Sequence, residues 1–216
     1  MPYMKGVNDM NDVLQPLFWR LANDQNTGID VVSVLMPHGD ESDKVAIEYA
    51  IDVSFKSLNK HTNPIDLRWS EEDSELFMNL LRKVLHITDK EVELDIEDNT
   101  VQGLIHLVAT ARFHTPWPGN DLEGEDFITY RKNLEVGDLI AINTAYGFCS
   151  AVIVALDSID ATVILLDNLV EPNEQDALEP EEGPEVIMPR NSLIMLSRVC
   201  ILPPEFAEGI SGVILH

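Results

Sequence analysis

Leu134-Glu135-Val136-Gly137-Asp138 opens the stretch that decides the fold of this chain, and the stretch runs on to Ser197. Short runs of apolar and β-branched residues recur along it, and turn-forming residues separate each run from the next. Such spacing is typical of a domain built from short antiparallel strands. The expected strands are residues 139–143, 148–157, 161–167, 186–188 and 193–196.

The turns between these runs have a recognisable order. They are Gly137-Asp138 before the first strand, Tyr146-Gly147, Ser158–Asp160, and Pro189-Arg190-Asn191-Ser192 before the last strand. This order resembles the small SH3-like barrels of the Tudor and KOW type, in which a Gly-Asp turn opens the barrel and a Pro-x-x-Ser turn precedes the last strand. The resemblance covers residues 134–199 and implies an SH3-like β-barrel, at the level of the fold and not of a particular family.

Binding members of that group carry features that this stretch lacks. Methyl-lysine readers surround the cation with several aromatic side chains, whereas here only Tyr146 and Phe148 are present, with Phe127 and Tyr130 just upstream. Nucleic-acid-binding members present Lys and Arg on their loops, but the loops of this stretch are acidic. We therefore expect a partner to bind at the acidic insertion of the barrel and not in a cage of aromatic residues.

The acidic insertion runs from Glu171 to Glu185, within a loop expected over 168–185, and is called the acidic segment here. Its prolines, glycine and charge favour a solvated loop. The functional alternative is a docking site for a basic protein surface, or a partial mimic of nucleic-acid phosphates. The candidate partner-binding acids are Glu171, Glu174, Asp176, Glu179, Glu181, Glu182 and Glu185.

The chain as a whole is strongly acidic. Its 216 residues include 38 Asp and Glu against 14 Lys and Arg, which leaves a net charge of −24. Affinity for nucleic acids depends largely on cationic side chains that release counterions from phosphates, so direct DNA or RNA binding is not expected. The acidity fits solubility, adaptation to salt, or attraction to a basic protein partner.

The first half of the chain predicts an α+β domain. Apolar residues occupy every second position from Val45 to Phe55, which predicts a strand that forms a β-hairpin with residues 29–36. Apolar residues at helical spacing predict helices over 12–22 and 76–85. Together these segments favour an antiparallel sheet with helices on one face.

Shorter signals fill in the rest of this domain. Ser70 followed by Asp73 predicts an N-terminal helix cap, and residues 67–69 suggest a brief strand before it. Residues 92–96 alternate as a strand does, and residues 101–113 are interpreted as the strand that pairs with it. Because apolar residues of 101–113 occupy both odd- and even-numbered positions, and not every second position as in a half-buried strand, a buried helix is the alternative for that run.

On this interpretation the order helix, strand, strand occurs twice, and residues 17–21 are similar to residues 76–80. In outline this resembles duplicated modules that bind small molecules in the groove between their repeats. The polar candidates for such a groove are Glu48, Asp52, His106 and Arg112.

Two domains are expected, because prolines and glycines are concentrated between His114 and Glu125. The proposed limits are an α+β domain at 1–115, a linker at 116–126, a barrel at 127–202 and a tail at 203–216. Trp117, between two prolines, is a candidate interface anchor, with packing across the domain junction as the alternative.

Targeting, redox and catalytic signals are few. Cys149 and Cys200 are the only cysteines, which excludes a disulfide framework and favours buried thiols. No signal peptide or membrane-spanning run is evident, so a cytoplasmic location without membrane binding is expected. The chain shows no nucleophile elbow, no phosphate loop and no paired metal-ligand motif, so no cofactor, metal or catalytic residue is predicted.

These observations favour a non-enzymatic protein-interaction role. An acidic viral or accessory regulator that binds a basic partner fits them. Two alternatives stay open: a small-molecule-binding protein or enzyme with its site in the N-terminal groove, and a structural subunit of an assembly. The oligomeric state is left undecided.

Overall fold

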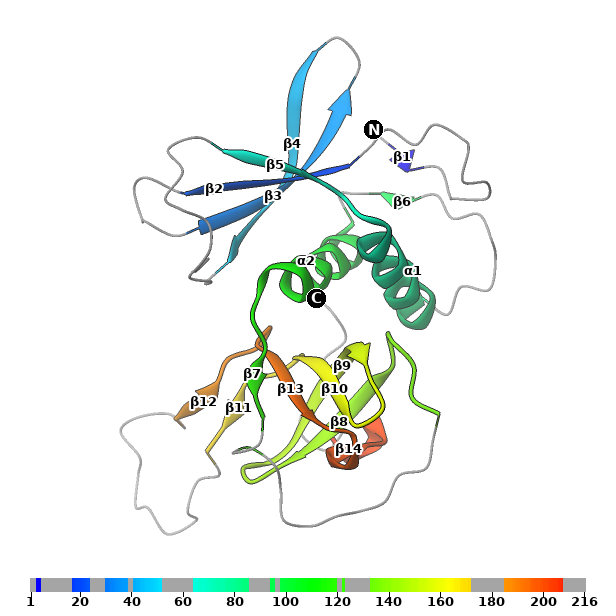
Figure 1. The fold of residues 1–216 in the computed structure, drawn as a ribbon, viewed down its shortest axis with the longest axis vertical. Helices are drawn as coiled ribbons and strands as arrows, with labels where there is room; N and C mark the ends of the chain where they lie inside the picture. Colours follow the sequence, from blue (N-terminus) through cyan, green and yellow to red (C-terminus); the bar gives the residue numbers. More distant parts are fainter. Residues whose placement is uncertain are drawn as a thin grey trace. The chain divides into compact units, whose positions relative to one another are not determined.

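A computed structural model describes residues 3–4, 17–23, 30–38, 41–51, 64–85, 94–95, 98–119, 122, 133–171 and 185–207 of the chain. The described residues form two compact units, the first up to His114 and the second from Thr115 onward. Helices and antiparallel strands both occur (Figure 1), which confirms the predicted α+β class.

The first unit contains an antiparallel sheet of four strands in the order β4-β3-β2-β5 (Figure 1). Strand β3 pairs with β4 from Asp30 opposite Ile51 to His38 opposite Glu41, which confirms the predicted hairpin up to Ile51. Residues 52–55 of that prediction lie outside the described residues. The bounds are Phe18–Asn23 for β2, Asp30–His38 for β3, Glu41–Ile51 for β4 and Ile65–Arg68 for β5, which overlaps the brief strand expected at 67–69.

The helix predicted over 12–22 is wrong where the structure describes it, because residues from Phe18 onward form strand β2. Trp19 and Leu21 are buried, while Arg20 between them pairs with Asp66 of β5. Strands β3 and β5 occupy both edges of β2. These long-range contacts outweigh the helical spacing of apolar residues, which is a local signal only.

Helix α1, Glu71–Leu85, confirms the predicted second helix and its cap. The Ser70 hydroxyl accepts a hydrogen bond from the Asp73 backbone N–H at 3.2 Å, and the Asp73 carboxylate accepts one from the Ser70 N–H at 2.8 Å. This reciprocal pair satisfies two backbone donors that the first turn of a helix would otherwise leave without partners.

The strand predicted over 101–113 is wrong, and the alternative of a buried helix is confirmed by α2, Asn99–Phe113. Apolar residues occupy both odd- and even-numbered positions because a wide face of the helix is buried. Its buried residues are Val101, Leu104, Ile105, Leu107, Val108, Ala109 and Thr110. Asp98 accepts the hydrogen bonds that begin the helix, a cap that explains why the run starts where it does.

The predicted duplication is also wrong for the described residues. Its first helix is replaced by strand β2 and its last strand by helix α2. Of the strand expected at 92–96, the structure contains β6, Leu94–Asp95, which pairs with β1, Tyr3–Met4, and not with 101–113. The similarity between residues 17–21 and 76–80 is therefore one of composition, since the two segments differ in backbone structure.

Replacing Asp98 with alanine is expected to destabilise the first unit by about 1 kcal/mol, the usual contribution of such a cap. Hydrogen bonds from the backbone N–H groups of Val101 and Thr100 hold the pKa of the Asp98 carboxyl below its ordinary value of 3.8. The stabilisation is therefore fully present above pH 3.8 and is lost as the pH falls through the lower folded-state pKa. Urea unfolding of both proteins at pH 7 and in steps below pH 3.8 should show a difference that shrinks with acid. A difference independent of pH would contradict this role.

The second unit contains a sheet of six strands in the order β14-β8-β9-β10-β13-β7 (Figure 1). All neighbouring strands are antiparallel except β13 and β7, which are parallel. The strands predicted at 139–143, 148–157, 161–167, 186–188 and 193–196 are confirmed, and the fourth of them is β12, Val186–Met188, which is not part of the six-stranded sheet. The other bounds are Trp117–Pro118 for β7, Leu139–Thr144 for β8, Gly147–Leu156 for β9, Asp160–Leu165 for β10, Leu193–Ser197 for β13 and Ile201–Leu202 for β14.

The core of the second unit gathers inward-facing aliphatic side chains from β8, β9, β10, β13 and β14. The branched side chains among them that are 1% exposed or less are those of Ile142, Ile153, Val163, Leu165, Ile194 and Ile201. Gly137, in the turn before β8, has a φ of 94° and donates its N–H to the Ile153 carbonyl at 2.8 Å. Since other residues rarely adopt positive φ, glycine is required at this turn.

Candidate functional site

The acidic segment is flanked in the sequence by two short strands that pair with each other, and these strands are called the neck here. Strand β11, Leu169–Val170, pairs antiparallel with β12. Just beyond this ladder, the Glu171 N–H donates to the Glu185 carbonyl at 2.9 Å, and both residues are exposed. The other predicted acids lie outside the described residues: Glu174, Asp176, Glu179, Glu181 and Glu182.

The neck is attached firmly to the second unit. Leu169 is buried, and Ile187 and Met188 pack against the core of the unit. After β12, the Arg190 N–H donates to the side-chain oxygen of Asn168 at 2.7 Å. None of these contacts uses an acidic side chain, so changes to the acids of the segment are expected to leave the neck intact.

Trp117 lies on β7, an edge strand of the six-stranded sheet, and the residue is 63% exposed. In the register of β7 with β13, Trp117 lies opposite Ile194 and Pro118 opposite Met195. The backbone N–H of Gly119 donates to the Met195 carbonyl at 2.7 Å, and this hydrogen bond joins the end of β7 to β13. The ring is therefore presented to solvent from a fixed backbone.

The stretch that holds Trp117 was predicted as a linker, residues 116–126. Two of its residues, 117 and 118, are paired with β13 and so belong to the sheet. The sequence signal for this strand is weak, since it is two residues long, contains proline and has a partner far along the chain. Gly119 is the residue that could have indicated it, because a glycine often marks close approach of two backbones.

Proline limits what the outer edge of β7 can bind. Successive residues of a strand direct their backbone groups to opposite sides, and Gly119 directs its N–H toward β13. Pro118 therefore directs its carbonyl away from β13, and proline has no N–H to accompany it. An edge with an acceptor and no donor is a poor template for another strand.

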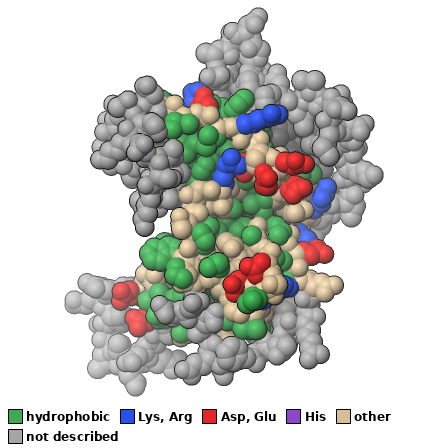
Figure 2. Space-filling model, viewed as in Figure 1, with side chains coloured by type: hydrophobic (Ala, Val, Ile, Leu, Met, Phe, Trp, Pro, Cys, Tyr) green, Lys and Arg blue, Asp and Glu red, His purple; other side chains and the backbone are tan. Residues whose placement is uncertain are grey.

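The surface around β7 combines apolar and acidic side chains. Figure 2 shows hydrophobic side chains gathered over β7 and β12, with acidic side chains at the ends of β11 and β12. Trp117 and Val186 are among the exposed large hydrophobic residues, and Glu171 and Glu185 border the two short strands. An apolar patch with acidic side chains beside it suits a protein partner whose own surface combines apolar side chains with Lys or Arg.

Of the four residues predicted for an N-terminal groove, one lies in strand β4 and two lie on helix α2. Glu48 lies in strand β4, opposite Ser33, and Asp52 lies outside the described residues. His106 and Arg112 both lie on α2. Six residues apart on a helix, they project in directions that differ by about 120°.

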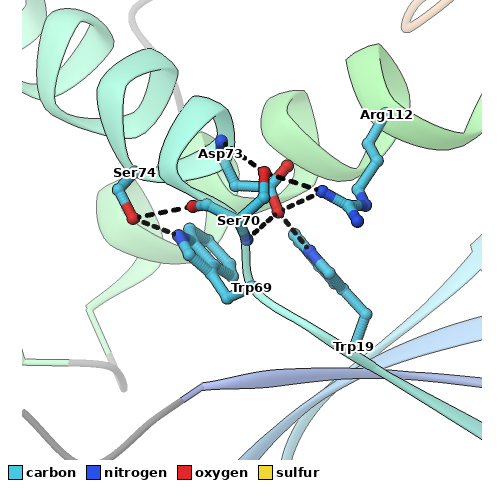
Figure 3. A network of polar contacts seen from close by, with 6 residues as sticks. All are labelled: Trp19, Trp69, Ser70, Asp73, Ser74 and Arg112. Carbon is cyan, nitrogen blue, oxygen red and sulfur yellow. Dashed lines mark hydrogen bonds and ion pairs between the residues drawn. The ribbon is translucent and has the colours of Figure 1, made fainter.

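Arg112 instead belongs to a polar network at the start of α1 (Figure 3). Its guanidinium donates to the Asp73 carboxylate at 2.5 Å and to the Ser70 hydroxyl at 3.0 Å. Asp73 also accepts a hydrogen bond from the Trp19 indole at 3.0 Å. The carboxylate is 5% exposed and the Arg112 side chain 27%, so the pair is shielded from water on the Asp73 side.

Aromatic rings enclose this network. The rings of Trp19 and Trp69 are stacked with centroids 4.7 Å apart, and Phe113 lies edge-on to Trp19 at 5.5 Å. The Trp69 indole donates to the Ser74 hydroxyl at 2.9 Å. The network thus connects β2, α1 and α2. Its hydrogen bonds and ion pair join these three elements, so we interpret it as a structural clamp.

Cys149 has the character of a buried structural thiol. Burial, and to a lesser extent the nearby Asp167 carboxylate, raises the pKa of the Cys149 thiol to about 11, so it is protonated at neutral pH and a weak nucleophile. Within the described ranges, no three His, Cys, Asp or Glu side chains cluster in a way that could hold a metal ion. Neither described helix combines the length and the apolar character needed to cross a membrane.

Comparison with known proteins adds no relationship to these observations. No protein-family model matches the chain, and no curated protein matches it. The chemistry of the surface around β7, β11 and β12 is therefore the basis for a functional proposal.

Proposed function

We propose that this chain is a non-enzymatic interaction protein that binds a basic surface on a protein partner through the acidic segment, with Trp117 as an apolar anchor. An acidic accessory regulator, of a cell or of a virus, is the kind of protein that this description fits. The observation that carries the proposal is the closed neck of the acidic segment, where the Glu171 N–H meets the Glu185 carbonyl at 2.9 Å.

The neck supports the proposal because its described contacts involve no side chain of the acidic segment. Glu171 and Glu185, which flank residues 172–184 in the sequence, are hydrogen-bonded through their backbones. The contacts of the neck come from its own backbone and from the core of the second unit. The charges of the segment are thus not needed to pair any described strand. A sequence of this charge, held on a fixed base, is suited to present carboxylates to a partner.

The net charge of −24 supports a basic partner over an acidic one. Like charges repel nucleic-acid phosphates and attract Lys- and Arg-rich protein surfaces, and the attraction extends about 10 Å at 0.1 M salt. Binding that depends on this attraction should weaken as salt rises.

We also propose that the second unit is an SH3-like barrel of the Tudor or KOW type. The Gly137-Asp138 turn precedes β8, two hairpins join β8, β9 and β10, and the Pro189–Ser192 turn precedes β13, as the resemblance implies. Strand β14 pairs with β8, so the last described strand of the chain lies beside the strand that follows the Gly137-Asp138 turn. This fold would act as the scaffold that holds the acidic segment and Trp117.

Replacing the seven acids of the acidic segment with their amides is expected to weaken binding to a basic peptide by about tenfold or more, since each exposed ion pair contributes a few tenths of a kcal/mol. The probe is a fluorescent peptide rich in Lys and Arg, titrated with the full chain at low and at physiological salt. Wild-type affinity should fall with salt, whereas the affinity of the variant should depend on salt much less.

A smaller pair of variants provides a matched control. Glu171→Gln/Glu185→Gln removes two exposed acids at the neck, and Glu71→Gln/Glu75→Gln removes two exposed acids from α1. If the acidic segment is the binding site, the first variant weakens binding and the second does not. Equal effects of both variants would show that binding follows net charge alone and would reject the proposed site.

A further inference from the structure

We propose that the Trp117 face of the second unit binds an arginine side chain of the partner, with the guanidinium stacked on the indole ring and directed toward the Pro118 carbonyl. This inference rests on the proposed function and deepens it, because it names the residue of the partner and the place where it binds. The face is the exposed side of β7, which carries the Trp117 ring and the Pro118 carbonyl.

The indole ring is the first reason. Tryptophan has the strongest attraction for cations among the aromatic side chains, and an exposed ring can accept a cation over its face. Trp117 is 63% exposed, and its strand is held by the pairing with Ile194 and Met195 and by the Gly119 hydrogen bond. A ring presented from a fixed backbone loses less entropy on binding than one on a mobile loop.

The edge of β7 is the second reason, and it is independent of the ring. Pro118 presents a carbonyl acceptor at the outer edge without an N–H donor beside it. A partner strand needs both groups to pair, whereas an arginine side chain has five donors and no acceptor. The edge therefore suits a guanidinium better than it suits a β-strand.

The negative charge around the face also favours a cationic side chain as its ligand. Figure 2 shows acidic side chains close to the hydrophobic side chains that gather over β7 and β12. Carboxylates near an aromatic ring favour a cation on it, and arginine stacks on rings and pairs with carboxylates more readily than lysine because its planar group is less strongly hydrated. A second copy of this chain is a poor occupant, since each copy has a net charge of −24.

The test uses the full chain and three labelled octapeptides in which glycine alternates with arginine, lysine or neutral citrulline. The readout is the affinity of each peptide together with the indole N–H signals in a nitrogen-15 correlation spectrum. The chain has three tryptophans. Trp19 and Trp69 donate their indole N–H to Asp73 and Ser74, so their signals act as internal references.

We expect the arginine peptide to bind most tightly and to shift the Trp117 indole signal while the other two indole signals stay in place. Trp117→Ala should weaken the arginine peptide by about two- to fivefold, the effect of an exposed cation–aromatic contact, and should affect the lysine peptide less. Trp117→Phe should retain part of the preference. Ile159→Ala, which truncates a side chain that is 69% exposed in the turn between β9 and β10, should change none of these values.

Three results would overturn the inference. Equal affinities for arginine and lysine peptides that Trp117→Ala leaves unchanged would show that cations bind only through the carboxylates, and the proposed function would stand without this contact. Failure of every cationic peptide to bind the wild-type chain would reject the proposed function itself. Self-association that Trp117→Ala abolishes would show that the face binds a second copy instead. Circular dichroism spectra of each variant establish that it is folded.

Discussion

Replacing Asp73 with asparagine is expected to destabilise the first unit by about 2 to 4 kcal/mol. The Asp73 carboxylate is 5% exposed and receives hydrogen bonds from the Trp19 indole, the Ser70 N–H and the Arg112 guanidinium. Asparagine keeps the shape but removes the charge that Arg112 needs. It can also place an N–H group against donors, so that one of them is left without an acceptor.

The measurement is urea unfolding followed by tryptophan fluorescence in a Trp117→Phe background. Trp19 and Trp69 are then the only tryptophans that remain, and both lie in the first unit. Because their rings are stacked 4.7 Å apart against the network, unfolding should change their emission strongly. The signal therefore reports the unit that contains Asp73 and is not mixed with unfolding of the second unit.

Asp66→Asn is the matched control. It is the same substitution, and Asp66 also pairs with an arginine, Arg20, at 2.7 Å. The Asp66 side chain, however, is 42% exposed, and ion pairs in contact with water contribute about 1 kcal/mol or less. A cost for Asp73→Asn as small as that for Asp66→Asn would contradict a clamp role for the network. In the double variant Asp73→Asn/Arg112→Gln, the losses should be less than additive, because the two residues act on each other.

The Asp73 network shows which parts of the fold local sequence can predict. The cap formed by Ser70 and Asp73 was predicted, since its donors and acceptors lie within one turn of helix. The contacts that Trp19 and Arg112 make with the same carboxylate were not, because they join residues from β2 and α2 that are distant in sequence. Arg112 was predicted as a groove residue from its polarity alone, and polarity does not distinguish a ligand contact from a structural ion pair.

The sequence predicted a helix where β2 lies and a strand where α2 lies, and the two errors have opposite causes. In β2, apolar residues happen to recur at helical spacing, and the pairing on both edges with β3 and β5 decides the structure. In α2, a helix buried over a broad side shows no clear period, so the apolar run could also be interpreted as a strand. The strands of the second unit were predicted more accurately, because Gly137 and Gly147, both at positive φ, mark its turns within the sequence itself.

Of the candidate interaction surface, the sequence indicated the acidic segment and Trp117 but not how they are held. The acids are visible as composition, and the tryptophan is visible between two prolines. The neck formed by β11 and β12 has only two or three residues in each strand, and β7 depends on a parallel partner, β13. Short strands carry too few residues for an alternating pattern, so only their tertiary pairing identifies them.

Replacing Gly119 with valine is expected to destabilise the second unit by about 1 to 3 kcal/mol, as overpacking does in a close-packed site. A Cβ at this position would lie 2.8 Å from the Met195 carbonyl oxygen and 3.0 Å from atoms of Ile194 and Leu196. The nearest contact is backbone, which cannot rotate away as a flexible side chain can. The end of β7 would therefore have to move from β13, and the Gly119 hydrogen bond to Met195 would be weakened.

This substitution also tests whether Trp117 binds from a fixed strand. Gly119 follows β7 in the chain and is buried, whereas Trp117 is exposed on β7. A loss of arginine-peptide affinity in Gly119→Val would therefore come from displacement of the strand and not from a lost contact. Gly103→Val is the matched control for stability, since a Cβ there meets no atom within 4 Å and the cost should be limited to the lower helix propensity of β-branched residues, offset by the removal of glycine. Thermal unfolding followed through the Trp117 indole N–H signal in nitrogen-15 correlation spectra should show that Gly119→Val lowers the stability of the second unit and that Gly103→Val leaves it unchanged. If Gly119→Val unfolds as the wild type does and still prefers the arginine peptide, β7 is not held by close contact with β13.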